Sequence, residues 1–313
     1  MKILVAYDGS GHSRSSLFDL QYAGLPSQAD ILILSVSEVW MPPTTGSADI
    51  DAIPDGEVRE YFRRWHEQVD RNMADTDAIA LEAHGTLQEL FPAWNIKTET
   101  VMGSAAPLIL SQASEFKPDL IVVGSRGLSS DGIGELGSIA QKVLTEARCA
   151  VRIARGTTEV EPSRLKIFVG FNNTPGSMAA VEEVASRQWP GDPEVRLVTI
   201  TDPLFPLIPG RAFQILPDWS QETIDRGELK WTTSLAEPAM GILKDAGLSA
   251  EQCVYSGNPR MMLSREAEAW GAHSLFVGAN PFPDTQANSP GTVALAVAGR
   301  ASCSVEIIRT NTY

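Results

Sequence analysis

The 313-residue chain lacks the features of a secreted, membrane-spanning or nucleic-acid-binding protein. It has three cysteines and no Cys-x-x-Cys pair, which predicts reduced core thiols rather than a disulfide framework. No apolar run approaches the roughly 18 residues that a membrane helix needs, and Asp8 interrupts the first run before it reaches signal-peptide length. The 39 acidic and 25 basic residues give a net charge of −14, which would repel a phosphate backbone. We therefore expect a soluble, cytoplasmic protein that binds neither a membrane nor nucleic acid.

Catalytic and metal-binding motifs are also missing. The sequence contains no Gly-x-x-x-x-Gly-Lys-Ser/Thr loop and no Gly-x-Ser-x-Gly nucleophile elbow. His66 and Glu67 are not followed by the second histidine of a zinc protease, and the remaining histidines are scattered through the chain. We assign no catalytic residue and no metal ligand.

The second half of the chain repeats the first. At a constant offset of 154 positions the same residue type recurs, as in Gly103 and Gly257, Gly124 and Gly278, Gly137 and Gly291, Cys149 and Cys303, Val151 and Val305, and Arg155 and Arg309. Near the start of each half the offset is 164, so the first copy carries ten extra residues. Repeats of this length are whole domains, which we place at residues 1–155 and 165–313.

Apolar runs alternate with helical segments in each copy. In the first copy we expect strands at residues 3–7, 31–36, 97–102, 120–123 and 149–154, and helices at 13–23, from 57 into the 80s, at 106–116 and at 138–146. Continuous Val, Ile and Leu strands separated by helices indicate a parallel sheet covered by helices on both faces. The predicted fold class is α/β, with two tandem doubly wound domains.

A glycine-rich turn follows the fourth expected strand and leads from Gly124 to Ser138, where a helix is expected to begin. Glycine lets the backbone approach an anion closely, and the N–H groups and dipole of a helix N-terminus favour negative charge. The strand, turn and helix therefore predict a phosphate site, with ordinary turn glycines as the alternative.

The spacing Gly-x2-Gly-x9-Gly-Ser at Gly124, Gly127, Gly137 and Ser138, with an opening strand that ends at Asp8, resembles the ATP-binding universal stress proteins in their tandem two-domain form. The resemblance implies a five-stranded parallel sheet of order 3-2-1-4-5 in each domain, with ATP at the point where the strand order reverses. It implies a stress-response or regulatory role. With no general base beside the glycine-rich turn, we expect no enzymatic activity beyond slow, incidental ATP hydrolysis.

The resemblance also assigns roles to residues of the first copy. Asp8 would contact the adenine, Val36 would meet the base through its backbone, and Gly103 would lie against the ribose. The phosphates would be lined by the residues of the glycine motif: Gly124, Gly127, Gly137 and Ser138.

Other side chains near this site have alternatives. Asp8 could instead cap the helix that starts near Ser13, and Arg126 could either reach a phosphate or remain solvated. Asp131 and Glu135 lie in the same turn, where they would repel a bare triphosphate. They fit better if Mg²⁺ accompanies the ATP, although solvated loop acids are the alternative.

The second copy departs from the motif. Asn172 replaces Asp8, and Pro281, which has no N–H group, replaces Gly127. A lost charge-assisted hydrogen bond costs about 1.5–3 kcal/mol, or about tenfold to a hundredfold in affinity. We expect one strong site in the first domain and a weak or empty site, with a residual pocket, in the second.

Arg152 and Glu306 occupy equivalent positions in the last expected strand of each copy. Universal stress domains commonly pair through this strand, so the resemblance implies an intramolecular pseudo-dimer in which the two strands run antiparallel and the charges meet. Such a pair would contribute about 0.2–1 kcal/mol and would tolerate a swap of the two charges. Two unrelated, solvent-facing charges are the alternative, and a further homodimer is left open.

Two other functions remain compatible with the sequence. A nucleotide-independent interaction or chaperone-like protein could bind an unknown protein partner through Pro-rich stretches at residues 41–56 and 203–219. An adenylate-forming enzyme is less well supported, because the Ser-Gly-Gly and His-x-Gly-His signatures are missing.

Overall fold

A computed structural model describes residues 1–38, 53, 55–126, 136–155, 164–201, 221–279 and 290–310. Gly127, Asp131, Glu135 and Pro281 lie outside these residues, as do most of the first Pro-rich stretch and all of the second. No helix of the described part is long and apolar enough to cross a membrane.

Five parallel strands form the sheet of the first half. In chain order its elements are β1 (Lys2–Ala6), α1 (Gly11–Asp19), the 3-10 helix η1 (Leu20–Tyr22), β2 (Asp30–Ser37), α2 (Gly56–Leu90), β3 (Asn95–Met102), α3 (Ala105–Phe116), β4 (Leu120–Gly124), α4 (Ser138–Glu146) and β5 (Ala150–Ala154). The strand order is β3-β2-β1-β4-β5, so the direction of winding reverses between β1 and β4.

The second half repeats this arrangement. Its elements are β6 (Lys166–Gly170), α5 (Pro175–Ser186), β7 (Glu194–Thr201), α6 (Gln221–Asp245), β8 (Ser249–Ser256), α7 (Pro259–Trp270), β9 (Ser274–Gly278), α8 (Thr292–Arg300) and β10 (Ser304–Ile308). The order β8-β7-β6-β9-β10 is again parallel and reverses at β6 and β9. The expected fold class, α/β with strand order 3-2-1-4-5 in each half, is confirmed.

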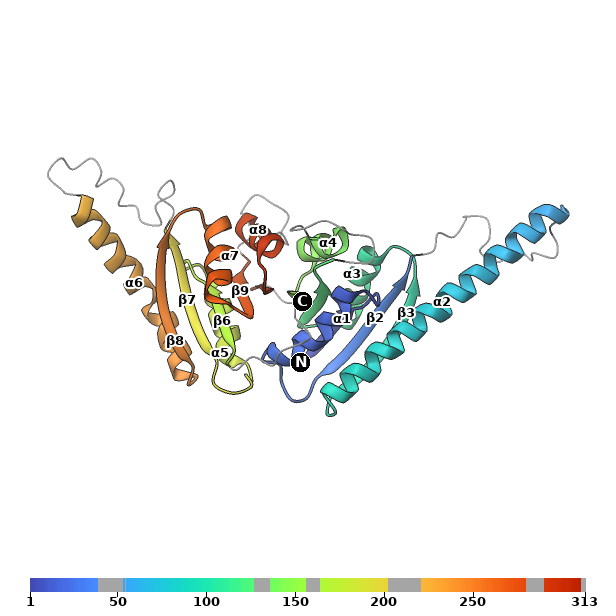
Figure 1. Ribbon diagram of the computed structural model, residues 1–313, viewed down its shortest axis with the longest axis horizontal. Helices are drawn as coiled ribbons and strands as arrows, with labels where there is room; N and C mark the ends of the chain where they lie inside the picture. The colour runs from blue at the N-terminus through green and yellow to red at the C-terminus, as the bar shows by residue number, and fades with distance from the viewer. Residues whose placement is uncertain are drawn as a thin grey trace.

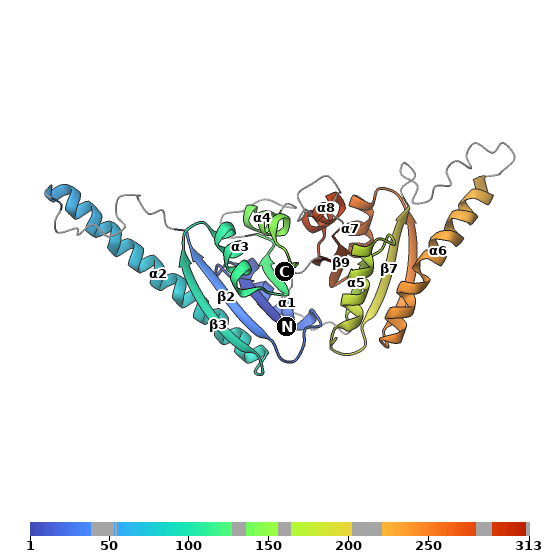
Figure 2. The same cartoon turned by 180° about the vertical axis from the view of Figure 1, so that it is seen from behind.

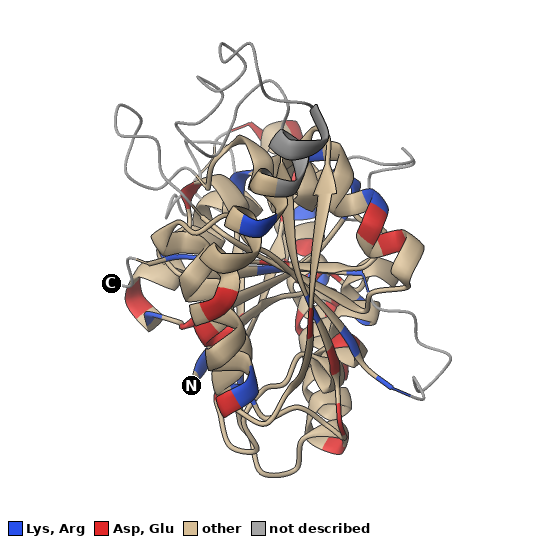
Figure 3. Ribbon diagram, turned by 90° about the vertical axis from the view of Figure 1, so that its left-hand side faces the viewer, with Lys and Arg blue, Asp and Glu red and all other residues tan. Residues whose placement is uncertain are grey.

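Helices cover both faces of each sheet because successive strand residues point to opposite sides. Ile3 packs in one core with Leu17 of α1 and Leu87 of α2, whereas its neighbour Leu4 packs in another core with Ile109 of α3. Figures 1 and 2 show these layers, with α2 and α6 at opposite ends of the molecule. Acidic and basic residues are interspersed over the helices in the side view (Figure 3).

The two halves join through β5 and β10, which pair antiparallel and make one sheet of ten strands. The core is continuous across the junction, since Val151 and Ile153 of β5 belong to the same cluster as Val305 and Ile307 of β10. The strand contact expected from the sequence is therefore present, and the junction is built as a protein interior.

Arg152 lies directly opposite Glu306 in this strand pair, and both side chains are completely buried. Their Nη1 and Oε2 atoms are 3.1 Å apart. Arg152 also donates to Asp19 of α1 through Nε, at 2.6 Å, and Nη2, at 3.1 Å. Burial lowers the pKa of Arg152, but Asp19 and Glu306 outweigh it and raise the pKa above the ordinary arginine value. The solvent-facing alternative is wrong.

Glu306 has a second cationic partner in its own half. Both Arg187 Nη atoms donate to it, Nη1 to Oε2 at 3.0 Å and Nη2 to Oε1. Arg187 also donates to Glu183 at 2.9 Å and to the Ala23 carbonyl oxygen of the first half at 2.6 Å. The junction thus holds a five-charge network and not an isolated pair, so the expected tolerance of a charge swap does not fit the structure.

Candidate functional site

A cavity of about 400 Å³ opens at the carboxyl ends of β1 and β4, where the strand order of the first half reverses. Ligands of open α/β sheets bind at such a point. The wall contains six of the eight residues that the sequence analysis assigned to a nucleotide: Asp8, Val36, Gly124, Arg126, Gly137 and Ser138. Of the other two, Gly127 lies outside the described residues.

Gly103 is not part of the described cavity wall. It lies in the turn between β3 and α3, where its N–H donates to the Ser37 carbonyl oxygen at 3.0 Å. Its φ of 140° is rarely adopted by a residue with a side chain, and a Cβ atom there would approach Leu108 to 3.0 Å. The turn itself therefore requires glycine, and the ribose contact stays a prediction.

The carboxylate of Asp8 does not cap α1. Ser10 is the N-cap, and its Oγ accepts from the Ser13 N–H at 3.2 Å. Oδ1 of Asp8 accepts from the Ser10 N–H at 3.0 Å, which braces the turn after β1. Oδ2 accepts no hydrogen bond from the described residues, so one carboxylate oxygen remains available in the cavity wall.

Gly124 lines the cavity, and the packing of β4 against α1 also requires a glycine at this position. A Cβ atom on it would lie 3.2 Å from the His12 carbonyl carbon and 3.3 Å from the Ser13 nitrogen. The end of β4 can therefore approach the start of α1 only without a side chain. This close approach brings the loop after β4 against the loop after β1, which forms the cavity.

The N-terminus of α4 supplies the polar donors of the cavity. Its N-cap, Gly137, has an ordinary φ of −61° and no side chain to accept from the first turn. Gly137 N–H donates to the Ser125 carbonyl oxygen at 2.9 Å, which fixes the start of the helix. Ser138 is exposed beside it. Uncapped N–H groups and the helix dipole at this point suit an anion.

The sequence analysis did not identify the apolar part of the wall. Leu34 lies on the same face of β2 as Val36, and it is joined by Ile109 of α3, Val123 of β4 and Ile139 of α4. The alternation of strand residues could have found Leu34 from Val36. Ile109 could not be found in this way, because only the packing of α3 against the sheet brings it to the cavity.

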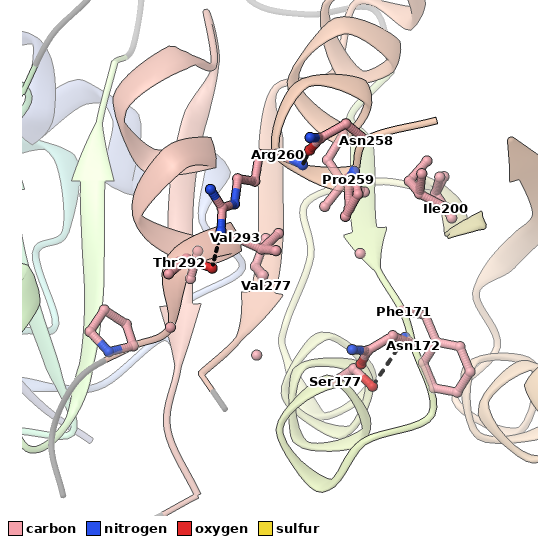
Figure 4. Close-up of a pocket in the computed structure, with 17 residues that line it drawn as sticks. Phe171, Asn172, Ser177, Ile200, Asn258, Pro259, Arg260, Val277, Thr292 and Val293 are labelled. Carbon is pink, nitrogen blue, oxygen red and sulfur yellow. Dashed lines mark hydrogen bonds between the residues drawn. The ribbon is translucent and has the colours of Figure 1, made fainter. Parts of the chain in front are cut away.

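The second half has a corresponding cavity of about 510 Å³ at the ends of β6 and β9 (Figure 4). Its polar groups differ from those of the first. Asn172 Oδ1, in the position of Asp8, accepts from the Thr174 hydroxyl at 2.6 Å. Arg260, which replaces Ala106 of the first half, donates to the Thr292 hydroxyl at 3.0 Å (Figure 4). The residual pocket exists, but it offers an amide and a guanidinium instead of a carboxylate.

Among the described residues, no group of three or more His, Cys, Asp and Glu side chains could hold a metal ion. Tyr7 and Asp8 are the acid–base candidates in the described wall of the first cavity, and burial raises the pKa of Tyr7. Arg126 contributes the cationic side chain of that wall. The arrangement can hold a polar head group and an anion around an apolar centre.

Comparisons with known proteins agree with this architecture. The model of the universal stress protein family matches residues 1–155. Universal stress protein YxiE of Bacillus subtilis (strain 168) is 30% identical over 156 residues, which are 49% of this chain and 98% of that relative. A Thermus aquaticus protein, described as the universal stress protein in the QAH/OAS sulfhydrylase 3' region, is 31% identical over 153 residues, 49% of this chain and 97% of that relative.

Solved structures resemble the whole chain. A universal stress protein from Archaeoglobus fulgidus DSM 4304 has a TM-score of 0.60 and 13% identity, with 99% of this chain and 96% of that chain covered. A functionally unknown protein from Pseudomonas aeruginosa PAO1 has a TM-score of 0.58 and 14% identity, with 98% and 92% covered. At such low identity these structures show the fold alone. The sequence matches, with which the fold agrees, lead to one conclusion: the chain belongs to the universal stress protein family.

Proposed function

We propose that the protein acts in stress response or regulation by binding ATP in the cavity of the first half. One observation carries the proposal: the same cavity wall combines a carboxylate oxygen of Asp8 that accepts no hydrogen bond from the described residues with the uncapped N-terminus of α4. A carboxylate accepts from the exocyclic amine of adenine, and a helix N-terminus stabilises a phosphate. The apolar side chains between them suit a flat base, and about 400 Å³ lies within the range of small-molecule sites.

Mg²⁺ would accompany the nucleotide as part of the ligand and would offset the charge of its outer phosphates. Arg126 would add a cation from the loop after β4. Of the acid–base candidates in the described wall, Asp8 is assigned to the adenine and burial raises the pKa of Tyr7, so we propose binding without designed hydrolysis. A protein partner would then respond to the presence or absence of ATP.

The second cavity should bind ATP weakly or not at all. An amide in place of a carboxylate weakens the contact with the adenine amine, and the oxygen of Asn172 is already bonded to Thr174. Arg260 could attract an anion, but it already donates a hydrogen bond to the Thr292 hydroxyl, and a guanidinium group would not distinguish adenine from other bases. The proposal is therefore one nucleotide per chain.

Calorimetry of nucleotide-stripped protein with Mg²⁺–ATP tests this directly. We expect one site, about tenfold to a hundredfold weaker in Asp8→Asn, which copies the residue of the second half. Asn172→Ala serves as the matched control and should leave binding unchanged. GTP should bind more weakly than ATP, because its base presents a carbonyl oxygen to Asp8. Two sites of similar affinity would contradict the asymmetry, and no binding in the parent would favour a nucleotide-independent interaction protein.

A further inference from the structure

A further groove, of about 450 Å³, lies at the junction of the two halves, where it is lined by residues of α1, the ends of β4 and β5, and the end of α8. Figure 1 shows these elements near the middle of the molecule. Four of its described lining residues are basic or can become so: His12 of α1, Arg126 after β4, Arg155 after β5, and Arg300 at the end of α8. None of the described lining residues is acidic, although the chain carries a net charge of −14. A concentration of positive charge in so acidic a protein requires an explanation.

Arg155 has an unsatisfied hydrogen-bond donor. Its Nη2 donates to the Ala298 carbonyl oxygen, but its Nη1 is buried and has no hydrogen-bond partner. The pKa of Arg155 is lowered to about 10, mainly by burial. The nearby Cys303 raises this pKa and the nearby Arg126 lowers it. Neither Arg155 nor Arg300 forms an ion pair with a described residue. Arg155 and Arg300 line the same groove, and an added anion would stabilise such guanidinium groups.

The fold does not impose this charge, because most of the equivalent positions in the other half of the repeat are not basic. Arg309 repeats Arg155 and likewise donates to a carbonyl oxygen across the junction, that of Leu144. This arginine pair therefore has a structural role in both halves. The other three basic residues have no basic counterpart at the repeat offsets of 164 and 154: His12 matches Gly176, Arg126 matches Asn280, and Arg300 matches Glu146.

The position of Arg300 in the last turn of α8 is by itself favourable, since a cation stabilises a helix C-terminus. That effect does not explain His12, which lies in the first turn of α1, at the end where a helix disfavours positive charge. His12 and the three arginines instead line one groove, where their side chains could act as donors to one ligand. Guanidinium groups match the geometry of phosphate oxygens, and they bind phosphate through paired hydrogen bonds.

We propose that this junction groove is an anion site for a phosphate or diphosphate group carried by a molecule other than the nucleotide in the first cavity. Arg126 lines both cavities, so the two ligands share one cation. Occupancy of one site should weaken the other, and this coupling must be reciprocal. The groove proposal itself does not depend on ATP binding, because its ligand can be tested alone.

The test uses inorganic pyrophosphate as the probe, with stripped full-length protein, constant ionic strength and no divalent cation. Calorimetry should show a pyrophosphate site in the parent whose affinity falls about tenfold to a hundredfold in Arg300→Glu, which imports the charge of Glu146. Arg148→Glu makes the same charge change at an exposed residue outside the groove and should bind within about twofold of the parent. His12→Gln should weaken binding by a smaller factor, since it removes one donor group without reversing charge.

The melting temperature of each variant without ligand shows whether it is folded, and Arg300→Gln replaces Arg300→Glu if the latter is not. Absence of pyrophosphate binding in the parent, or an equal loss in Arg148→Glu, overturns the site. A second arm repeats the titration with the first cavity saturated by AMP, where binding should persist with reduced affinity. A different result would refute the separate site. If Arg300→Glu weakens the binding of ATP but not of AMP, and pyrophosphate does not bind to the ATP-saturated protein, the groove holds the outer phosphates of the nucleotide.

Discussion

Exchanging the two opposed charges of the junction, in the double variant Arg152→Glu with Glu306→Arg, should strongly destabilise the protein. A glutamate at position 152 would face Asp19, which now lies 2.6 Å from the Arg152 Nε atom. An arginine at position 306 would face Arg187, which now donates to both oxygens of Glu306. The swap restores attraction between strands β5 and β10 and creates repulsion within each half.

The magnitude follows from burial. Arg152 and Glu306 are 0% exposed, and removing one partner of a buried ion pair costs about 3–5 kcal/mol. The swap leaves Asp19 and Arg187 each beside a like charge, so we expect a loss of at least about 3–5 kcal/mol of unfolding free energy. Each single substitution should cost a similar amount.

Urea denaturation at pH 7 measures the effect through the midpoint and slope of the transition. The control is the swap Arg164→Glu with Glu194→Arg, a pair at 2.7 Å whose side chains are 46% and 37% exposed. That swap should change the unfolding free energy by less than about 0.5 kcal/mol. If the buried double variant is also within about 0.5 kcal/mol of the parent, the five-charge network does not act as described.

Two further substitutions and one pH effect test the packing. Gly278→Ala should destabilise the protein by about 1–3 kcal/mol or more, because a Cβ atom would lie 2.0 Å from the Gly176 backbone. Gly85→Ala, which has open space around it in α2, should stabilise the protein by about 0.5–1 kcal/mol. Urea denaturation that ranks the two variants in the opposite order would contradict the close approach of Gly278 and Gly176. Burial lowers the pKa of His273, and the adjacent Lys166 ammonium adds to this, while the Lys166 N–H donates to its Nδ1 at 3.0 Å. The folded state thus favours the neutral imidazole ring. The contribution of His273 to the unfolding free energy should therefore be present above about pH 6.5 and decline as the pH falls below that value. If the unfolding free energies of the parent and of His273→Gln depend equally on pH between about 7.5 and 5.5, this prediction is refuted.

The charge network also explains why the two halves pair with each other. Pairing of β5 with a second β5 would oppose two Arg152 side chains, and pairing of β10 with a second β10 would oppose two Glu306 side chains. Both arrangements bury like charges, whereas β5 with β10 buries an attractive pair. Strand pairing alone would allow all three.

Much of the candidate site could be predicted because its residues follow strand ends. Asp8 follows β1 and Val36 lies near the end of β2, and parallel strands bring such residues to one edge of the sheet. Arg260 could not be predicted as a partner of Thr292, because the two residues come from different helices, α7 and α8. The alternative in which Asp8 caps α1 was excluded only by the hydrogen bond that makes Ser10 the cap, and the adenine contact of Asp8 stays a prediction.

The sequence by itself determined the α/β class, because this depends on periodicity and on residues close together in the chain, and it predicted that the second half repeats the first. It also placed Arg152 and Glu306 at equivalent positions, and family resemblance placed them opposite each other. Only the tertiary structure decided that both are buried and that Asp19 and Arg187 complete their network. The same holds for the basic groove, whose residues converge from α1, α8 and the ends of β4 and β5. Burial and the convergence of distant side chains depend on how helices pack across the sheet, which local sequence patterns do not specify.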